Sequence, residues 1–129
     1  MATTDGPLNN YRVRQMTLDD VAAVIELQER AFPGQPPWRL DQLARHLQVF
    51  PEGQLVVSGT DGRLLGSASS LLIDWDDYAE SANWSSITGD GTFDTHNPLG
   101  KTLYGADMGV DPEARLWASA RPSMRRART

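Results

Sequence analysis

Tyr104-Gly-Ala-Asp-Met-Gly-Val-Asp-Pro-Glu-Ala-Arg115 is the stretch that decides the fold of this chain. A short apolar run ends at Val110, and the Asp111-Pro112 pair that follows is typical of a turn that begins a helix. The stretch therefore predicts a buried strand over residues 103–110, followed by a turn and the start of a helix.

Three further strands are predicted upstream of this stretch. Residues 11–14 alternate and suit a half-buried first strand. Residues 54–58 and 63–73 predict a hairpin, because Asp61-Gly62 between them is a strong signal for a two-residue turn whose two central residues need a positive φ.

Two helices are predicted between the first strand and the hairpin. Thr17 is the expected N-cap of the first helix, with Asp20 at the reciprocal capping-box position, and Pro33-Gly34 ends it. Helical spacing predicts an inner face made of Leu18, Val21, Ala22, Ile25 and Phe32, flanked by Val24 and Gln28. The second helix, over residues 38–48, is expected to leave His46 at the surface and to bury Leu40, Leu43, Ala44 and Leu47.

Residues 74–102 differ from the rest of the chain, being polar and rich in Asp, Gly, Asn and Thr. They also carry Trp75, Tyr78, Trp84 and Phe93, which argue against disorder. We expect a folded excursion with a short helix near residues 78–84. The resulting order, β-α-α-β-β-excursion-β, indicates an α/β fold with a mixed, α+β-like sheet over residues 11–115, preceded by a disordered segment at 1–10.

Composition and charge narrow the function. The 129 residues include no Cys, so disulfides and thiolate sites are excluded, and no apolar run reaches the length of a membrane span. The net charge of −5 divides into −9 over residues 1–115 and +4 over 116–129. The acidic body argues against nucleic-acid binding, and a cytoplasmic protein is expected. The basic tail is either an unstructured end or an arm for nucleic acid or membrane.

Several segments resemble the GNAT family of N-acyltransferases over residues 11–115. They include Arg30-Ala-Phe-Pro33, Pro36-Pro-Trp38, Phe50-Pro-Glu-Gly-Gln-Leu-Val-Val57, Leu65-Gly-Ser-Ala-Ser-Ser-Leu71, Asp74-Trp-Asp-Asp-Tyr78 and Ile87-Thr-Gly-Asp-Gly-Thr-Phe93. The resemblance is to a branch often fused to a carbon–nitrogen hydrolase domain. It implies transfer of an acetyl group from acetyl-CoA to an amine, with residues 32–38 and 74–96 on the acceptor side.

The resemblance also implies roles for single residues. Backbone groups of Met108, Gly109 and Val110 are expected to lie along the pantetheine arm, and Arg115 matches the first position of the pyrophosphate-binding loop. Asp107 is the candidate proton-relaying carboxylate, against the alternative of a solvent-facing charge on the strand. Gly109 either admits the ligand to the backbone or eases a bulge in the sheet.

No metal site is expected. Asp74, Asp76, Asp77 and Glu80 lack the sixth-position Gly and the distal Glu of a calcium loop. His46 and His96 lie fifty residues apart with no Cys to complete a zinc site.

The sequence after Arg115 departs from the GNAT pattern. The Arg/Gln-x-x-Gly-x-Gly/Ala loop is missing, because residues 116–129 contain no Gly. Read in the shifted frame, the Trp117–Ala118 junction must encode Gly, at the first glycine position of the motif. We therefore expect a truncated, inactive domain whose tail reflects a frameshift, in the gene or in sequencing. The alternative is a non-enzymatic interaction module, which completes itself by pairing with another chain through its open sheet edge. The edge from Leu103 to Val110 is also expected to allow self-association.

Overall fold

The computed structural model describes residues 11–114, which form a four-stranded antiparallel sheet in the order β1-β2-β3-β4. The strands are β1 (Tyr11–Gln15), β2 (Gln54–Gly59), β3 (Leu64–Ile73) and β4 (Thr102–Val110). The helices are α1 (Val21–Ala31), α2 (Leu40–Val49) and α3 (Trp84–Thr88), with short 3-10 turns η2 (Leu18–Asp20), η3 (Pro51–Gly53) and η4 (Trp75–Asp77). The predicted α/β class and element order are confirmed.

The predicted hairpin lies where the sequence indicated, but its turn is of another type. Among residues 59–63 only Gly62 has a positive φ, of 83°. Its N–H donates to the Gly59 carbonyl, and the Gly59 N–H donates to the Arg63 carbonyl. This is a three-residue connection with a left-handed Gly after an ordinary turn, so the two-residue turn predicted at Asp61-Gly62 is wrong.

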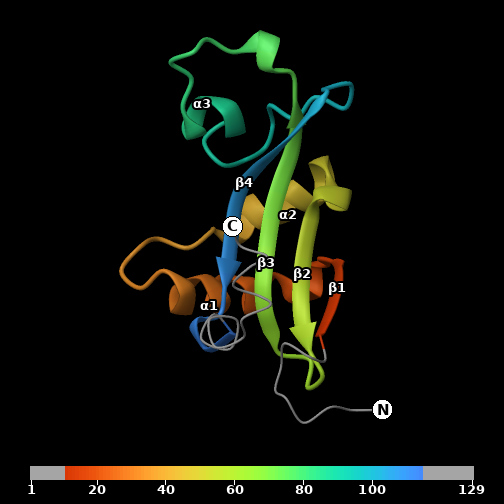
Figure 1. Cartoon of the computed structure of the whole chain (residues 1–129), viewed down its shortest axis with the longest axis vertical. Coiled ribbons are helices and arrows are strands. Elements are labelled where there is room, and N and C mark those ends of the chain that lie inside the picture. The colour runs from red at the N-terminus through yellow and green to blue at the C-terminus, as the bar shows by residue number, and fades with distance from the viewer. Residues whose placement is uncertain (1–10, 115–129) are drawn as a thin grey trace, which may run out of the picture.

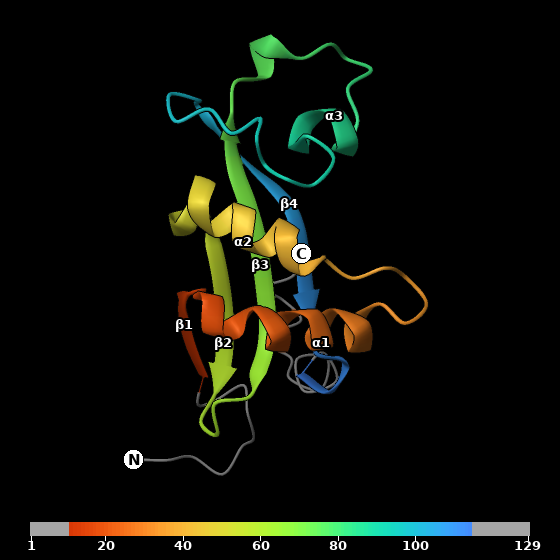
Figure 2. The ribbon, with the colours of Figure 1, turned by 180° about the vertical axis from the view of Figure 1, so that it is seen from behind.

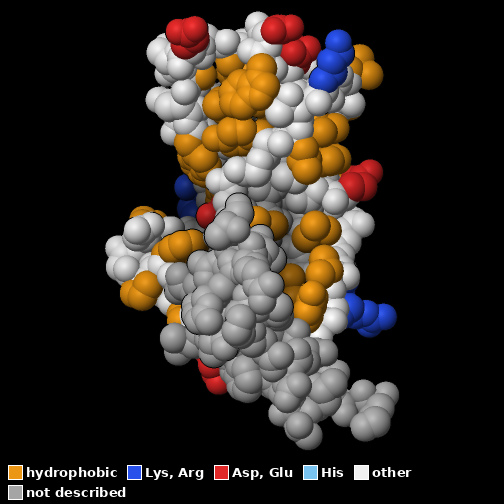
Figure 3. Space-filling model, viewed as in Figure 1, with side chains coloured by type: hydrophobic (Ala, Val, Ile, Leu, Met, Phe, Trp, Pro, Cys, Tyr) orange, Lys and Arg blue, Asp and Glu red, His pale blue; other side chains and the backbone are white. Residues whose placement is uncertain are grey.

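Both long helices cover the same face of the sheet (Figures 1 and 2). The core between helices and sheet consists of Met16, Val21, Val24, Leu27, Trp38, Leu43, Val56, Leu64, Leu71, Ile73, Ile87 and Phe93. The opposite face carries neither long helix, and Figure 3 shows hydrophobic side chains on it. The exposed apolar side chains of the sheet include Val13, Leu55, Leu103 and Met108.

The start of α1 follows the capping prediction in part. Asp20 accepts a hydrogen bond from the Thr17 backbone N–H (2.9 Å) and pairs with Arg14 (2.7 Å). The Arg14 hydrogen bond is the main reason that the pKa of Asp20 falls to about 2. The ion pair between Arg14 and Asp20 therefore ties β1 to the start of α1.

The predicted inner face of α1 is confirmed in part. Val21 is buried and Ile25 packs half-buried against the core, but Leu18 is 67% exposed and Ala22 is exposed. The buried residues of the helix are Val21, Val24, Leu27, Gln28 and Ala31. The first turn is 3-10, with three residues per turn, and this shifts which residues of the later α-helical turns meet the sheet.

The second helix buries Leu43 as predicted, but Leu40 is 66% exposed and His46 is fully buried. His46 was expected at the surface. The difference arises because the excursion between β3 and β4 covers a second side of α2 (Figure 2).

The excursion is folded, as predicted, but its helix begins at Trp84 rather than near residue 78. Asn83 caps this helix by accepting from the Ser86 N–H (2.9 Å). The chain returns beside β3, where the Asn97 N–H donates to the Leu72 carbonyl (2.8 Å).

The predictions for residues 1–10, for Arg115 and for the tail 116–129 lie outside the described residues. Residues 112–114 begin a helical turn, as expected after the strand. Within residues 11–114, none of the helices has the length and apolar character needed to cross a membrane.

Candidate functional site

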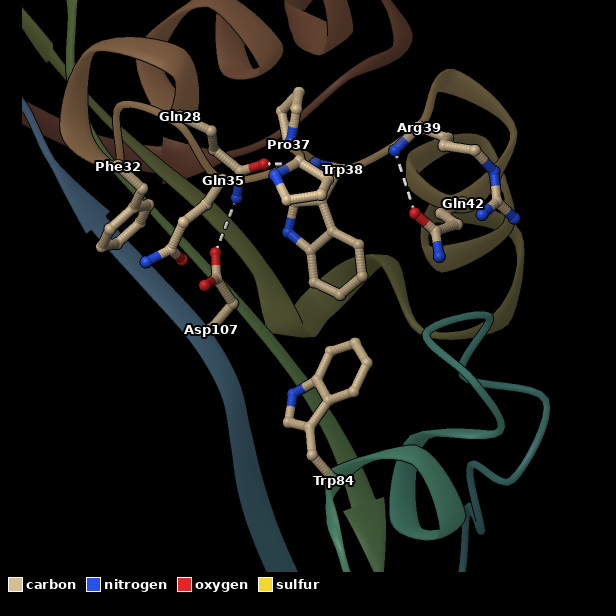
Figure 4. Close-up of a pocket in the computed structure, with 10 residues that line it drawn as sticks. Gln28, Phe32, Gln35, Pro37, Trp38, Arg39, Gln42, Trp84 and Asp107 are labelled. Atoms are coloured by element: carbon tan, nitrogen blue, oxygen red, sulfur yellow. Dashed lines mark hydrogen bonds between the residues drawn. The ribbon is translucent and has the colours of Figure 1, made fainter.

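A cavity of about 410 Å³ lies between the α1–α2 connection, α3 and β4 (Figure 4). It is lined by Gln28, Phe32, Gln35, Pro36, Pro37, Trp38, Arg39, Gln42, Trp84 and Asp107. The structure thus brings Asp107 together with residues from both segments that the resemblance assigned to the acceptor side. A cavity of this size suits a small-molecule group rather than a single ion.

Asp107 enters the cavity wall beside an irregularity in the sheet. In the pairing of β3 with β4, Ser69 faces Asp107 but Ser70 faces Gly105, so Ala106 is an extra residue. Such a bulge re-aims the neighbouring side chains. The bulge alternative raised for Gly109 is wrong, because Gly109 pairs regularly with Ser67 and the bulge lies at Ala106.

The bulged segment is held by an aromatic side chain of the excursion. The indole Nε1–H of Trp84 donates to the Ala106 carbonyl (2.8 Å). Trp84 therefore links α3 to β4 at one wall of the cavity.

Gln28 clamps the site from α1. Its side chain is buried, and its Nε2 donates to Oδ2 of Asp107 (2.7 Å) while its Oε1 accepts from the Trp38 backbone N–H (2.6 Å). The two contacts fix the orientation of the amide, since only the nitrogen can donate to the carboxylate. Figure 4 shows Gln28 between these two partners.

Burial raises the pKa of Asp107 above its ordinary value. The hydrogen bond from Gln28 favours the ionised form and partly offsets this effect, as do weaker interactions with the Trp38 indole and the Met108 backbone. A carboxylate with a raised pKa is a better proton acceptor than an exposed one. Asp107 is half-buried in the cavity wall, and both its proton-relay role and the alternative of an ordinary strand charge stay predictions.

Aromatic rings form the walls of the cavity. The rings of Trp38 and Trp84 lie 5.7 Å apart and are tilted by 32°. The Trp38 indole N–H is buried beside the Asp107 carboxylate, and its weak interaction with that group favours the ionised form.

Gly91, beside the cavity, leaves room for the rings of Trp38 and Trp84 because it has no side chain. Gly91 has a φ of 87°, and a Cβ there would lie 2.6 Å from Nε2 of Gln42 and 3.1 to 3.2 Å from atoms of Trp38 and Trp84. The Gly91 carbonyl accepts from Nε2 of His46 (2.6 Å), so the position is set by its contacts as well as by its backbone.

His46 and Phe93 fasten the excursion to α2. Their rings stack at 3.6 Å and 10°, and Trp38 meets both edge-on. Phe93 is fully buried although its φ is 66°, a conformation that bulky residues rarely adopt. Burial lowers the pKa of His46 to about 4, so the ring is neutral at pH 7.

β4 is the edge strand of the sheet within the described residues. The Asp111 N–H donates to the Leu65 carbonyl, so alternation along an antiparallel pair directs the backbone groups of Gly109 toward β3. The same alternation directs those of Met108 and Val110 toward the open edge. Of the three residues predicted to contact pantetheine, Met108 and Val110 therefore have backbone groups that point away from β3, toward the open edge.

Asp111 lies just after the strand and has a structural role. It is 2% exposed, pairs with Arg30 and Arg63 (3.1 Å each) and accepts from the Glu113 N–H (2.9 Å). Burial alone would raise the pKa of Asp111, but these partners outweigh burial and hold it below its ordinary value. The residue caps the helical turn that the sequence predicted.

The structure places Asp107 in the cavity wall, and its proton-relay role stays a prediction. Sequence reasoning missed Gln28 as the hydrogen-bond partner of Asp107. The spacing of Gln28 put it on a helix flank, and no local pattern links it to a strand 79 residues away. Among residues 11–114, no cluster of three or more His, Cys, Asp or Glu side chains could hold a metal ion.

No known family profile matches the sequence. Two proteins of Bacillus subtilis (strain 168) are similar to it. "Probable hydrolase YhcX" is 41% identical over 103 residues, which cover 80% of this chain and 20% of that protein. "Uncharacterized N-acetyltransferase YkwB" is 36% identical over 107 residues, covering 80% of this chain and 47% of that protein. The chain thus spans less than half the length of either relative.

Solved structures share the fold at low sequence identity. The GphF GNAT-like decarboxylase in complex with isobutyryl-CoA has a TM-score of 0.65 at 22% identity, covering 86% of this chain and 60% of its own. The loading GNATL domain of CurA from Lyngbya majuscula gives 0.67 at 16% identity, covering 87% and 58%. Chaetomium thermophilum Naa20 in complex with a bisubstrate analogue gives 0.52 at 16%, covering 84% and 53%. These likenesses show a GNAT-like fold.

Proposed function

We propose that residues 11–114 form the front part of a GNAT-type N-acetyltransferase domain, which transfers an acetyl group from acetyl-CoA to an amine. The observation that carries the proposal is the position of Asp107. It lines the cavity and belongs to β4, the strand at the open edge of the sheet. The acceptor amine and the thioester would then meet at one point of the strand.

Each part of the reaction has a candidate group. The amine nitrogen attacks the thioester carbonyl, the amide bond forms, and the carbon–sulfur bond breaks to release the thiolate of CoA, which takes up a proton from water to give the thiol. Asp107, whose pKa is raised by burial, would accept the proton that the amine loses. Outward backbone N–H groups of Met108 and Val110 would hold the pantetheine arm and polarise the carbonyl.

Two structural neighbours support an acyl-CoA as the co-substrate. GphF is in complex with isobutyryl-CoA, and Naa20 is in complex with a bisubstrate analogue. For this chain, acetyl-CoA, the pyrophosphate contact of Arg115 and fusion to a carbon–nitrogen hydrolase domain are proposals. The last is supported by the hydrolase relative, of which the chain covers a fifth.

The proposal is tested with S-acetylpantetheine, which contains the reacting thioester but no pyrophosphate. Binding should therefore not depend on residues after Ala114. In a ¹⁵N NMR titration we expect shift changes at the amides of Met108 and Val110 and around Asp107, and none along β1. An absence of change at β4 at about 10 mM probe, in a folded sample, would contradict the proposal.

A second candidate function is self-association through the same edge. It is favoured by the exposed side chains of Leu103 and Met108, which are 61% and 70% exposed on a strand with no outer neighbour among residues 11–114. Shifts at β4 that depend on protein concentration, without any response to S-acetylpantetheine, would favour this function instead.

A further inference from the structure

A second hollow lies on the excursion, beside the cavity of Asp107. Its volume is about 470 Å³, and it is lined by Trp75, Tyr78, Ala79, Glu80, Ala82, Asn83, Trp84, Ile87 and Tyr104. We call it the aromatic groove. Four of its lining residues are aromatic, and they come from η4, α3, β4 and the segment between η4 and α3.

The rings of the aromatic groove make a corner rather than a packed core. Trp75 and Tyr104 lie 6.0 Å apart at 83°, as two perpendicular walls. Trp75 is 50% exposed and Trp84 is 40% exposed, so part of each side chain reaches solvent. Exposed aromatic rings arranged in this way attract organic cations through their electron-rich faces.

Charge around the aromatic groove points to the same ligand class. The excursion, residues 74–102, contains six carboxylates and one basic residue, Lys101. Asp94 pairs with Arg45, whereas Asp76, Asp77 and Glu80 make no ion pair within residues 11–114. Figure 3 shows acidic side chains, a basic one and hydrophobic ones at the end of the molecule formed by the excursion. Exposed like charges next to aromatic faces favour a bound positive charge.

The volume of the aromatic groove favours a small molecule as its ligand rather than a metal ion. Its volume lies in the range of small-molecule sites and is far larger than a metal ion needs. Trp84 is shared with the Asp107 cavity and is fixed by its hydrogen bond to the Ala106 carbonyl. The groove therefore has one rigid wall.

We propose that the aromatic groove binds a small organic ammonium ion, held by cation–π contacts with Trp75, Tyr104 and Trp84 and by the carboxylate of Glu80. This binding does not require the acyl-transfer proposal, because the groove is a separate hollow from the Asp107 cavity.

The test compares choline with 3,3-dimethylbutan-1-ol, its uncharged isostere, on the full 129-residue chain. NMR titration should give shift changes at Trp75, Tyr78 and Tyr104, with choline binding about tenfold more tightly than the alcohol. Equal affinities for the two, or choline shifts confined to the Asp107 cavity, would overturn the proposal.

Variants locate the site. Trp75→Ala should weaken choline binding about fivefold or more, and Glu80→Gln about twofold to fivefold. Leu99→Ala is the matched control, since Leu99 belongs to the excursion, is 87% exposed and does not line the groove. It should leave choline binding unchanged. Unchanged binding in Trp75→Ala, with a native NMR spectrum, would contradict the proposal.

The source of the ammonium group is tested separately. A peptide that carries N-trimethyllysine has the same headgroup as choline. If the peptide bound at least about tenfold more tightly than choline, the small-molecule assignment would be wrong. Comparable affinity would support it.

Discussion

Asp107 and Asp111 lie only four residues apart in the sequence, yet their surroundings differ in chemistry. Asp107 borders an aromatic region formed by Trp38, His46, Trp84 and Phe93. Asp111 lies in an ionic region with Arg30 and Arg63. Burial raises the pKa of Asp107, whereas hydrogen bonds and ion pairs outweigh burial and lower that of Asp111.

The comparison teaches that burial alone does not decide what a carboxylate does. The Asp111 side chain exposes less surface than that of Asp107, but its charged partners and a backbone N–H offset the cost of burying its charge. Asp111 therefore stays ionised and has a structural role. Asp107 has only neutral partners, chiefly the Gln28 amide, and its pKa stays above the ordinary value. The following predictions test this contrast, beginning with the largest effect.

The aromatic region should depend on ring packing. Phe93→Ala removes a fully buried ring that stacks on His46 and meets Trp38, and we expect a loss of about 3–5 kcal/mol in the free energy of unfolding. Leu99→Ala, on the exposed part of the same excursion, should change it by less than about 0.5 kcal/mol. Urea denaturation measures both, and similar losses would show that the stack does not hold the excursion.

The aromatic region should also lose stability in acid because of His46. Its pKa is lowered by burial from 6.5 to about 4, so the unfolded chain binds more protons between these values. The contribution of neutral His46 to the free energy of unfolding is fully present above pH 6.5. It falls by about 3 kcal/mol as the pH drops to 4. His96, whose pKa is also lowered by burial, contributes with the same sign.

The contribution of His46 is isolated by a variant. His46→Gln keeps a donor for the Gly91 carbonyl but cannot titrate. Its unfolding free energy should vary less with pH between 4 and 6.5 than that of the unmodified chain. Parallel pH profiles for the two proteins would rule out this role.

The ionic region should respond to loss of charge. Asp111→Ala removes a helix cap and the partner of two arginines, and we expect a loss of about 2 kcal/mol. The loss is moderate because Arg30 and Arg63 are 38% and 48% exposed and remain hydrated. High salt should reduce the difference between the two proteins, measured by denaturation at low and high ionic strength. A salt-independent difference would mean that the cap alone matters.

The smallest effect concerns the proton affinity of Asp107. Gln28→Met removes the hydrogen bond that favours the ionised carboxylate at similar side-chain volume, so the pKa of Asp107 should rise further. ¹³C NMR titration of the carboxyl carbon measures this shift. The pKa of Asp111 should not respond, which provides an internal control, and a fall in the pKa of Asp107 would contradict the assigned role of Gln28.

The two carboxylates also link stability to pH with opposite signs. Because the pKa of Asp107 is raised, its contribution to stability decreases as the pH rises from 3.8 through the folded value. Because the pKa of Asp111 is lowered, its contribution is present above 3.8 and is lost as the pH falls.

The sequence by itself determined the elements whose signals are local. The hairpin glycine, the strand before Asp111 and the order of strands and helices follow from turn residues and short-range spacing, and the structure has them. Asp107 was identified in the same way, from its place on the strand before the turn.

Only the tertiary structure decided which faces of the helices are buried and what surrounds Asp107. His46 is buried because the excursion packs on α2, and Gln28 becomes a partner of Asp107 because α1 crosses β4. His46 and Phe93 are separated by 47 positions in the sequence, and Gln28 and Asp107 by 79. The periodic pattern of one segment does not predict its contacts with such a distant segment. Local chemistry thus specified the strands and turns, while packing between distant segments specified the site.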